Sequence, residues 1–255
     1  LEAKLLHTDT ITVNGKSIGE NIEKHKSKDT NVIKKVTNPI MKNAGFIVLS
    51  GNLFDSALMK TSVISEDFRK RFLSNSGEEN ILRAKAVVFE GPEDYHNRLN
   101  DPELNIDEKT ILFIRGVGCV GYPGSAEVVN MQPPDKLLKK GITHLPTVGD
   151  GRQSGTSESP SILNASPESV VGGGLAYLKT GDPVILDLNK GTLNADVDEK
   201  EWSNRIKKWK EPKIENQTPW QEIYRTNVGQ LADGGCLELA TAYKRIAKHL
   251  PRDNH

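Results

Sequence analysis

Short apolar runs recur along the chain and are bounded by turns rich in glycine, proline, asparagine and serine. Runs of this kind between turn-forming residues are typical of buried strands. They predict strands at Phe46–Leu49, Ala57–Ile64, Arg83–Phe89, Ile111–Ile114 and Ile142–Val148. Two further runs, Pro183–Leu188 and Thr192–Val197, flank the turn Asn189-Lys190-Gly191 and favour a hairpin. Strand patterns therefore dominate the chain after its first 45 residues.

Helical patterns are fewer and mostly short. Ser17 can cap a helix over Ile18–Lys24, with Glu20 three residues on as its capping-box partner. Further helices are predicted at Pro92–Asn97, Ala126–Met131, Pro134–Lys140, Glu199–Lys210 after a cap at Asp198, Trp220–Tyr224 and Leu237–Leu250. Because strands and helices do not alternate uniformly, the pattern predicts a β-rich α/β domain and not a series of βαβ units.

Charge and hydropathy narrow the class of protein. The 34 Lys and Arg residues balance the 34 Asp and Glu residues, so no net field points to nucleic acid or to an acidic membrane surface. No apolar run approaches the roughly 20 residues that are needed to span a bilayer. A chain of 255 residues can form one or two domains and bury a sizeable core. We therefore expect a loop-rich enzyme domain that binds neither nucleic acid nor membrane.

The two cysteines, Cys119 and Cys236, give neither a disulfide framework nor a metal-ligand spacing. A reducing compartment is therefore expected: the cytoplasm, or the mitochondrion if the source is eukaryotic. The chain opens on Leu1 without a methionine or a signal-like region. We expect it to be a fragment of a longer protein or a processed product.

The stretch Gly149–Ser157 joins a predicted strand to glycines and small hydroxyl residues. Such a junction is a common way to hold side chains or backbone N–H groups against a ligand. The glycines also leave the hydroxyl of Ser154 open to a substrate. The alternative is a Gly/Ser surface turn, in which Asp150 and Arg152 form a pair that braces the loop.

A second glycine motif, Gly116-Val117-Gly118-Cys119-Val120-Gly121, matches the dinucleotide-binding pattern G-x-G-x-x-G and follows a strand. A dinucleotide site also needs a helix that starts inside the motif and an acidic residue about 20 positions later, after a second strand. Tyr122-Pro123-Gly124 interrupts any such helix, and the second strand comes late. We therefore expect the glycines to let the backbone turn closely beneath Glu127.

Three motifs occur in a fixed order along the chain. They are Gly121-Tyr122-Pro123-Gly124-Ser125-Ala126-Glu127-Val128, the loop Gly149–Ser157 with its continuation through Pro160–Glu168, and Gly172–Ala176. Together they resemble the C-terminal part of the IlvD/Edd dehydratases, a family of dihydroxy-acid, phosphogluconate and aldonic-acid dehydratases. The resemblance runs from about Leu6 to about Cys236, and the first motif is most similar to the sugar-acid branch.

The resemblance implies an α/β, β-rich fold: a swivelling, β-barrel-like domain with peripheral helices. Residues 1–36 would then be the tail of a larger N-terminal domain and a linker, and residues 37–255 would form the C-terminal dehydratase domain. Because the partner domain is missing, we expect Leu6–Lys34 to pack poorly and Asn38–His249 to form one compact unit.

The resemblance also implies the roles of two residues. Glu127 occupies a position that ligates Mg²⁺, and a carboxylate suits such a hard cation. Ser154 is the catalytic base that takes the C2 proton of a 2,3-dihydroxy acid, while an iron–sulfur cluster acts as Lewis acid on the C3 hydroxyl and Mg²⁺ stabilises the enolate. The cluster needs thiolate ligands that Cys119 and Cys236 cannot supply, so the missing N-terminal domain would hold them. This chain alone is therefore expected to lack catalysis and to bind Mg²⁺ weakly.

Other assignments stay open at this point. Thr156 and Ser157 are candidates for binding substrate hydroxyls, or they cap a turn. The substrate is a small hydroxy acid, either an aldonic acid or a branched-chain dihydroxy acid, and a non-catalytic binding domain is the third possibility. A serine hydrolase is remote, because Gly151–Gly155 lacks the G-x-S-x-G spacing. The expected partners are the N-terminal domain of the same enzyme and further copies of the chain in a homo-oligomer.

Overall fold

A computed structural model describes residues 4–26, 28–41, 44–153 and 158–240. The chain divides into two compact units, residues 1–44 and 45–255. The first unit contains one helix, α1 (Ile18–Ile22), among its described residues. The predicted capping box is confirmed, because the Ser17 hydroxyl accepts from the Glu20 N–H at 3.1 Å and the Ser17 N–H donates to the Glu20 carboxylate at 2.7 Å.

Most apolar side chains of the first unit are exposed. Those more than half exposed are Leu5, Leu6, Ile11, Val13, Val32, Ile33, Val36, Ile40 and Met41. No described residue between 4 and 41 is buried. This segment therefore has no apolar core of its own within its described residues.

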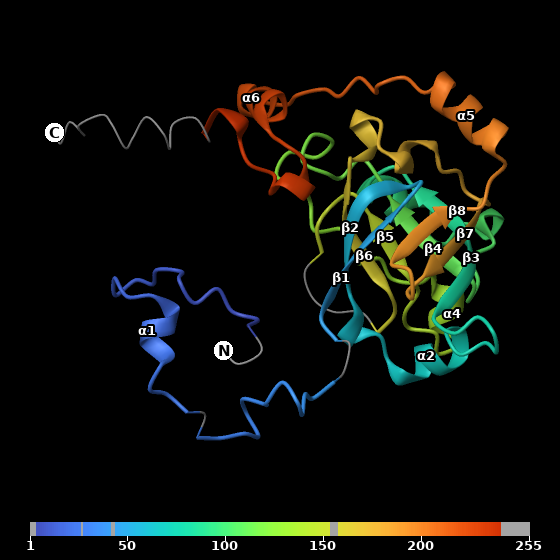
Figure 1. Ribbon diagram of the computed structural model, residues 1–255. Coiled ribbons are helices and arrows are strands. Elements are labelled where there is room, and N and C mark those ends of the chain that lie inside the picture. Colours follow the sequence, from blue (N-terminus) through green and yellow to red (C-terminus); the bar gives the residue numbers. More distant parts are fainter. Residues whose placement is uncertain (1–3, 27, 42–43, 154–157, 241–255) are drawn as a thin grey trace. The chain divides into compact units, whose positions relative to one another are not determined.

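The second unit is built on a closed eight-stranded barrel (Figure 1). Its strands are β1 (Phe46–Gly51), β2 (Phe54–Lys60), β3 (Ile81–Phe89), β4 (Thr110–Ile114), β5 (Thr147–Gly149), β6 (Ser161–Ser166), β7 (Pro183–Asp187) and β8 (Thr192–Ala195). Around the barrel they run in the order β1-β2-β6-β5-β4-β3-β7-β8. The predicted β-rich barrel with peripheral helices is confirmed.

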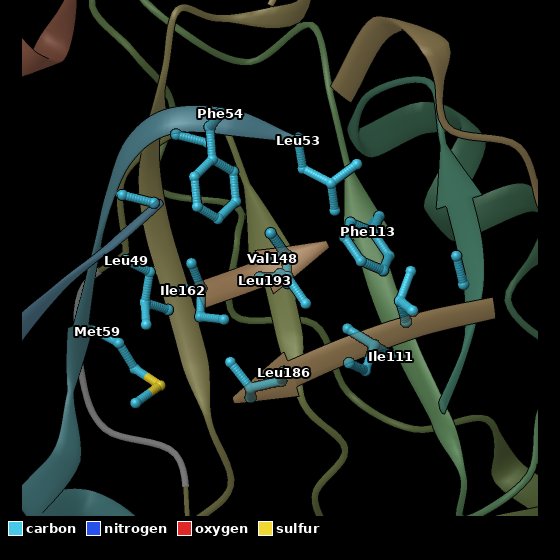
Figure 2. Packing of buried hydrophobic residues seen from close by; sticks show 14 of the residues in the cluster. Leu49, Leu53, Phe54, Met59, Ile111, Phe113, Val148, Ile162, Leu186 and Leu193 are labelled. Atoms are coloured by element: carbon cyan, nitrogen blue, oxygen red, sulfur yellow. The ribbon is translucent and has the colours of Figure 1, made fainter. Parts of the chain in front are cut away.

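The barrel interior is filled by apolar side chains from every strand (Figure 2). Its largest fully buried members include Leu49, Leu53, Phe54, Met59, Ile111, Phe113 and Ile162. Figure 2 shows these side chains pointing toward one another across the barrel. The interior is therefore a packed core and not a ligand channel, as is usual for a barrel of eight strands.

A second apolar layer covers the outside of β3 and β4. Leu112 and Ile114 point outward and are as buried as Ile111 and Phe113, which point inward. The loops after β4, together with α3 (Pro92–Arg98) and α4 (Asp135–Leu138), contribute side chains to this layer. Burial on both faces explains why the central strands are continuously apolar in sequence.

The remaining helices lie around the barrel. They are α2 (Glu66–Phe72), α5 (Glu199–Lys208) and α6 (Pro219–Asn227), with short 3₁₀ turns at Thr61–Val63, Pro102–Leu104, Ser169–Val171, Gly174–Tyr177 and Leu231–Asp233. Helix α5 is anchored by Arg205, whose guanidinium contacts both carboxylate oxygens of Asp182, at 2.5 Å and 3.0 Å. No helix in the described part of the chain is long and apolar enough to cross a membrane.

Several predicted boundaries are wrong. The strand predicted at Ile142–Val148 is reduced to β5, because Pro146 has no N–H to donate and only its carbonyl pairs, with the Leu112 N–H at 2.9 Å. The strand predicted at Ala57–Ile64 ends at Lys60 and continues as a 3₁₀ turn. The pattern also missed β6, whose serines are buried, and α2, which buries only Phe68. Most of the predicted helix Leu237–Leu250 lies outside the described residues.

Four adjacent strands, β3, β4, β5 and β6, run parallel. Their carboxyl ends therefore lie at one end of the barrel, where loops from distant parts of the sequence meet. In sheets of this kind, ligands bind at the carboxyl ends of the strands.

Limited proteolysis tests the proposed division of the chain. Because none of the described residues between 4 and 41 is buried, we expect the first cuts to fall there and a fragment beginning near Gly45 to persist. The fragments are identified by mass spectrometry. A first cut between Ile142 and Val184 would contradict this expectation.

Candidate active site

Two loops leave the parallel strands side by side. In the sheet register, Ile114 at the end of β4 pairs with Gly149 at the end of β5. The next residues, Arg115 and Asp150, therefore enter their loops next to each other. The barrel thus brings the two glycine motifs of the sequence together, although 27 residues lie between them.

Asp150 is the buried centre of this junction, with no exposed surface. Its carboxylate accepts from the backbone N–H groups of Gly116 at 3.1 Å and Val117 at 3.0 Å. It also accepts from the N–H of Ser169 at 2.9 Å and from the Ser169 hydroxyl at 2.6 Å. Asp150 therefore holds the loop after β4 and the loop after β6 together.

The predicted Asp150–Arg152 pair is wrong, because these four donors occupy the Asp150 carboxylate and no described ion pair involves it. Arg152 instead donates from Nε to the carbonyl of Ser125 at 2.8 Å. Its Nη1 lies 4.0 Å from the Glu127 carboxylate. Asp150 and Arg152 therefore hold the site through separate contacts. Asp150 acts from a buried position, and Arg152 acts from the surface.

Glu168, which follows β6, is a second buried carboxylate, only 2% exposed. It accepts from the N–H groups of Val120 at 2.9 Å and Gly121 at 2.8 Å, and from the Gln230 amide at 3.0 Å. Burial raises the pKa of Glu168, and the charge of Asp150 adds to the effect, while the two backbone donors act against it.

The same stretch of loop is held from its other side by helix α6. The Nε of Arg225 donates to the carbonyl of Val120 at 2.8 Å, and Nη2 lies 3.4 Å from the carbonyl of Gly121. Tyr224, the preceding residue, lies next to the thiol of Cys119. Burial and the Glu168 charge raise the pKa of Cys119, which makes it a structural thiol and not a reactive one.

These contacts explain why Gly116–Gly121 is not a dinucleotide site. A phosphate-binding loop presents free backbone N–H groups to its ligand. Here the N–H groups of Gly116, Val117, Val120 and Gly121 are taken by Asp150 and Glu168. Between the end of β4 and the start of α4, a segment that is described throughout, no helix begins.

The glycines are required by close packing. A Cβ at Gly118 would lie 2.5 Å from the Glu168 carboxylate, and one at Gly121 would lie 2.6 Å from the carbonyl of Gly116. The predicted tight turn is thus confirmed. At Gly151, a Cβ would lie 2.8 Å from the carbonyl of Ala126. Gly151 therefore lets the loop after β5 pack against the segment that carries Glu127.

That segment is not helical, so the prediction of a helix at Ala126–Met131 is wrong. The Arg152 N–H donates to the Ala126 carbonyl at 3.0 Å, and the Val129 N–H donates to the Arg152 carbonyl at 3.3 Å. These pairings replace the bonds that a helix would make within itself. Ser125 has a φ of +56°, which also breaks a helix.

Glu127, the predicted Mg²⁺ ligand, lies at the surface with a side chain that is 45% exposed. Among the described residues its one ion pair is with Arg152, at 4.0 Å. The carboxylate is thus open to solvent. Among the described residues, no group of three or more His, Cys, Asp or Glu side chains could hold a metal ion.

The three predicted hydroxyl residues, Ser154, Thr156 and Ser157, lie outside the described residues. Their neighbours on each side are fixed. The Asn164 N–H in β6 donates to the Gly151 carbonyl at 2.9 Å, and the Gln153 side chain hydrogen-bonds to the Ser161 hydroxyl. The chain therefore enters this stretch directly beside Glu127 and Arg152.

Two contributors to the site, Glu168 and Arg225, were not predicted. Glu168 stood in a motif of the resemblance, after Ser166-Pro167, and its burial gave no sequence signal of its own. Arg225 lies in α6, whose pattern of polar and apolar residues is that of an ordinary surface helix and does not single Arg225 out. Only the folded loop shows that both bind the backbone of Val120 and Gly121.

Comparison with known proteins identifies the class. Residues 31–236 match the model of the dihydroxy-acid/6-phosphogluconate dehydratase C-terminal region. The chain belongs to this family, the IlvD/Edd dehydratases, and corresponds to its C-terminal domain.

Individual relatives refine the picture. The chain is 56% identical over all 255 residues to D-xylonate dehydratase of Caulobacter vibrioides, covering 43% of that protein. It is 36% identical over 209 residues to L-arabinonate dehydratase of Rhizobium leguminosarum, covering 82% of this chain and 34% of the relative. With dihydroxy-acid dehydratase of Acetivibrio thermocellus the identity is 30% over 236 residues, which is 92% of this chain and 40% of the relative. The chain thus spans less than half the length of these relatives.

The role of Asp150 can be tested by its removal. In Asp150→Ala, the N–H groups of Val117 and Ser169 and the Ser169 hydroxyl lose their acceptor inside the protein, and the Gly116 N–H keeps only the Ser169 hydroxyl. We expect a loss of about 3 kcal/mol or more in the free energy of unfolding, measured by urea denaturation. The matched control is Asp55→Ala on the exposed face of β2, which should stay within about 0.5 kcal/mol of the parent. Equal effects of the two substitutions would contradict the assignment.

Proposed function

We propose that this chain is the C-terminal part of a hydro-lyase that dehydrates an aldonic acid to a 2-keto-3-deoxy acid. The observation that carries the proposal is the identity of 56% to D-xylonate dehydratase along the whole chain. The lower identity to a dihydroxy-acid dehydratase makes the branched-chain substrate the second candidate. A non-catalytic binding domain is the third, since the chain covers only part of each relative.

Ser154 is the proposed base. Its oxygen, as an alkoxide, accepts the proton from C2 of the substrate. The electron pair of the broken C–H bond forms a double bond between C2 and C3 as the C3 hydroxyl departs. The departing hydroxide takes the proton that Ser154 accepted and leaves as water, which restores the alkoxide. The resulting enol then tautomerises to the 2-keto acid. Thr156 and Ser157 are proposed to hydrogen-bond substrate hydroxyls.

Glu127 fits a role as one oxygen ligand of Mg²⁺, because its carboxylate is exposed and its ion pair with Arg152 is long, at 4.0 Å. When bound, Mg²⁺ supplies positive charge that stabilises the developing enolate. Arg152 keeps the Glu127 segment in place through the carbonyl of Ser125. The other metal ligands would come from the N-terminal domain, so the isolated chain should be inactive.

The thiols of this chain do not fit an iron–sulfur cluster. Such clusters are held by several thiolates, whereas Cys119 is buried with a raised pKa and Cys236 is exposed. Cluster ligands, if present in the enzyme, are proposed to lie in the N-terminal domain.

The substitution Ser154→Ala in the full-length enzyme tests the proposal. With D-xylonate as substrate, loss of the base should lower kcat by about 10²–10⁴-fold. The matched control, Ser203→Ala on the exposed surface of α5, should retain the parent rate. Keto-acid formation is measured together with the melting temperature and the visible absorption of any cluster.

Three outcomes would overturn all or part of the proposal. A Ser154→Ala enzyme that keeps its fold and more than about a tenth of the rate would exclude Ser154 as base, since the loss is below the usual range for a general base. A parent enzyme that converts a branched-chain dihydroxy acid and leaves D-xylonate and L-arabinonate untouched would support the second candidate. Absence of turnover with all three substrates would favour the binding domain.

A further inference from the structure

Glu168 is a buried carboxylate to which the reaction described above assigns no role. Placing a carboxylate in a protein interior is costly unless its charge is compensated. Glu168 forms no ion pair with any described residue, and its acceptors are filled by two backbone N–H groups and one amide. The burial of this carboxylate among neutral donors therefore needs a structural or functional reason.

The peptide group between Val120 and Gly121 is bound from both sides. Its N–H donates to Glu168 at 2.8 Å, and its carbonyl accepts from Nε of Arg225 at 2.8 Å. The anion and the cation polarise this peptide group in the same sense, so the two hydrogen bonds reinforce each other. Glu168 also accepts the Val120 N–H, and Arg225 also reaches the Gly121 carbonyl. This part of the loop is therefore fixed by one side chain from the loop after β6 and one from α6, which are distant in sequence.

The fixed loop leads directly to Glu127. The Tyr122 N–H donates to the Gly118 carbonyl at 2.9 Å, and the Ser125 N–H donates to the Tyr122 carbonyl at 2.7 Å. Two consecutive turns thus connect Val120 and Gly121 to the segment that carries Glu127. Arg152 holds that segment on both sides of Glu127, by donating to the Ser125 carbonyl and by accepting from the Val129 N–H. Displacement of the loop at Val120 would shift the backbone that aims Glu127.

We propose that Glu168 is a positioning residue that, together with Arg225, fixes the orientation of Glu127 and so sets the affinity of the enzyme for Mg²⁺. This inference rests on the proposed function, in which Glu127 is a Mg²⁺ ligand. Residues that orient metal ligands without touching the metal commonly control affinity in this way. Glu168 acts through the backbone of the Glu127 segment.

The test is the Mg²⁺ dependence of the full-length enzyme, read both from the rate with D-xylonate as substrate and from the rise of the melting temperature with Mg²⁺ in the absence of substrate. In Glu168→Gln, the side-chain NH₂ group replaces one acceptor and faces a backbone donor. We expect the Mg²⁺ concentration for half-maximal rate to rise about 10- to 100-fold, with a smaller change in the rate at saturating Mg²⁺. A purely structural role would leave this concentration unchanged.

Asp187→Asn provides a matched control. Asp187 is also buried and accepts two backbone N–H groups, those of Asn189 at 2.9 Å and Lys190 at 3.0 Å. It pairs with Ile81 at the start of β3, which is the opposite end of the barrel from the site. It should lose stability without any change in Mg²⁺ dependence. An equal Mg²⁺ shift in both variants would overturn the inference.

Two further variants keep the test decisive. If Glu168→Gln does not fold, Arg225→Lys replaces it, because a lysine cannot bond both carbonyls as the guanidinium does; it should shift the Mg²⁺ dependence in the same direction, and no shift overturns the inference. Glu127→Gln distinguishes a failure of the proposed ligand role of Glu127 from a failure of the positioning role of Glu168. If it leaves the Mg²⁺ dependence unchanged, the ligand role of Glu127 fails and the inference with it. If it shifts the dependence while folded Glu168→Gln does not, only the inference fails.

Discussion

The hydrogen bonds from the backbone of Gly116–Gly121 to two buried carboxylates are the constraint on which the site depends. Asp150 binds the first two N–H groups of the loop and Glu168 binds the last two. A glycine-rich loop with this many N–H groups pointing inward would otherwise be an anion site. The protein fills that site with its own side chains, which turns a ligand-binding pattern into a rigid support.

The barrel makes this arrangement possible. Parallel pairing of β4 with β5 and of β5 with β6 places Asp150 and Glu168 at the same end as the loop that they bind. The two apolar layers on either side of β4 fix the strand ends in turn. Arg225 adds a third anchor from beyond the barrel, since α6 follows all eight strands in the sequence. The loop that leads to Glu127 is thus held from three parts of the chain, by Asp150 after β5, Glu168 after β6 and Arg225 in α6.

Much of the fold follows from the pattern of apolar runs. The cores of β1, β3, β4 and the β7–β8 hairpin were predictable because burial on one or both faces leaves a clear apolar signal. Strand β6 was not, because its buried serines and Asn164 are polar and Asn164 has a φ of +57°. The segment at Ala126–Met131 read as helical because local propensity cannot show that its backbone pairs with Arg152.

The candidate site divides in the same way. The resemblance supplied Glu127 and Ser154, and the described structure adds the exposure of the Glu127 carboxylate. Glu168 and Arg225 could not be predicted, because their importance comes from contacts across 48 and 105 residues of sequence. Long-range polar contacts of this kind leave no periodic signal.

Amide hydrogen exchange is the most direct measurement of the central claim. If buried carboxylates hold the loop, the amides of Gly116, Val117, Val120 and Gly121 should exchange as slowly as those of β4. Glu168→Gln should then speed exchange at Val120 and Gly121 first. Exchange of all four amides at the rate of the exposed segment around Lys213 would contradict the account.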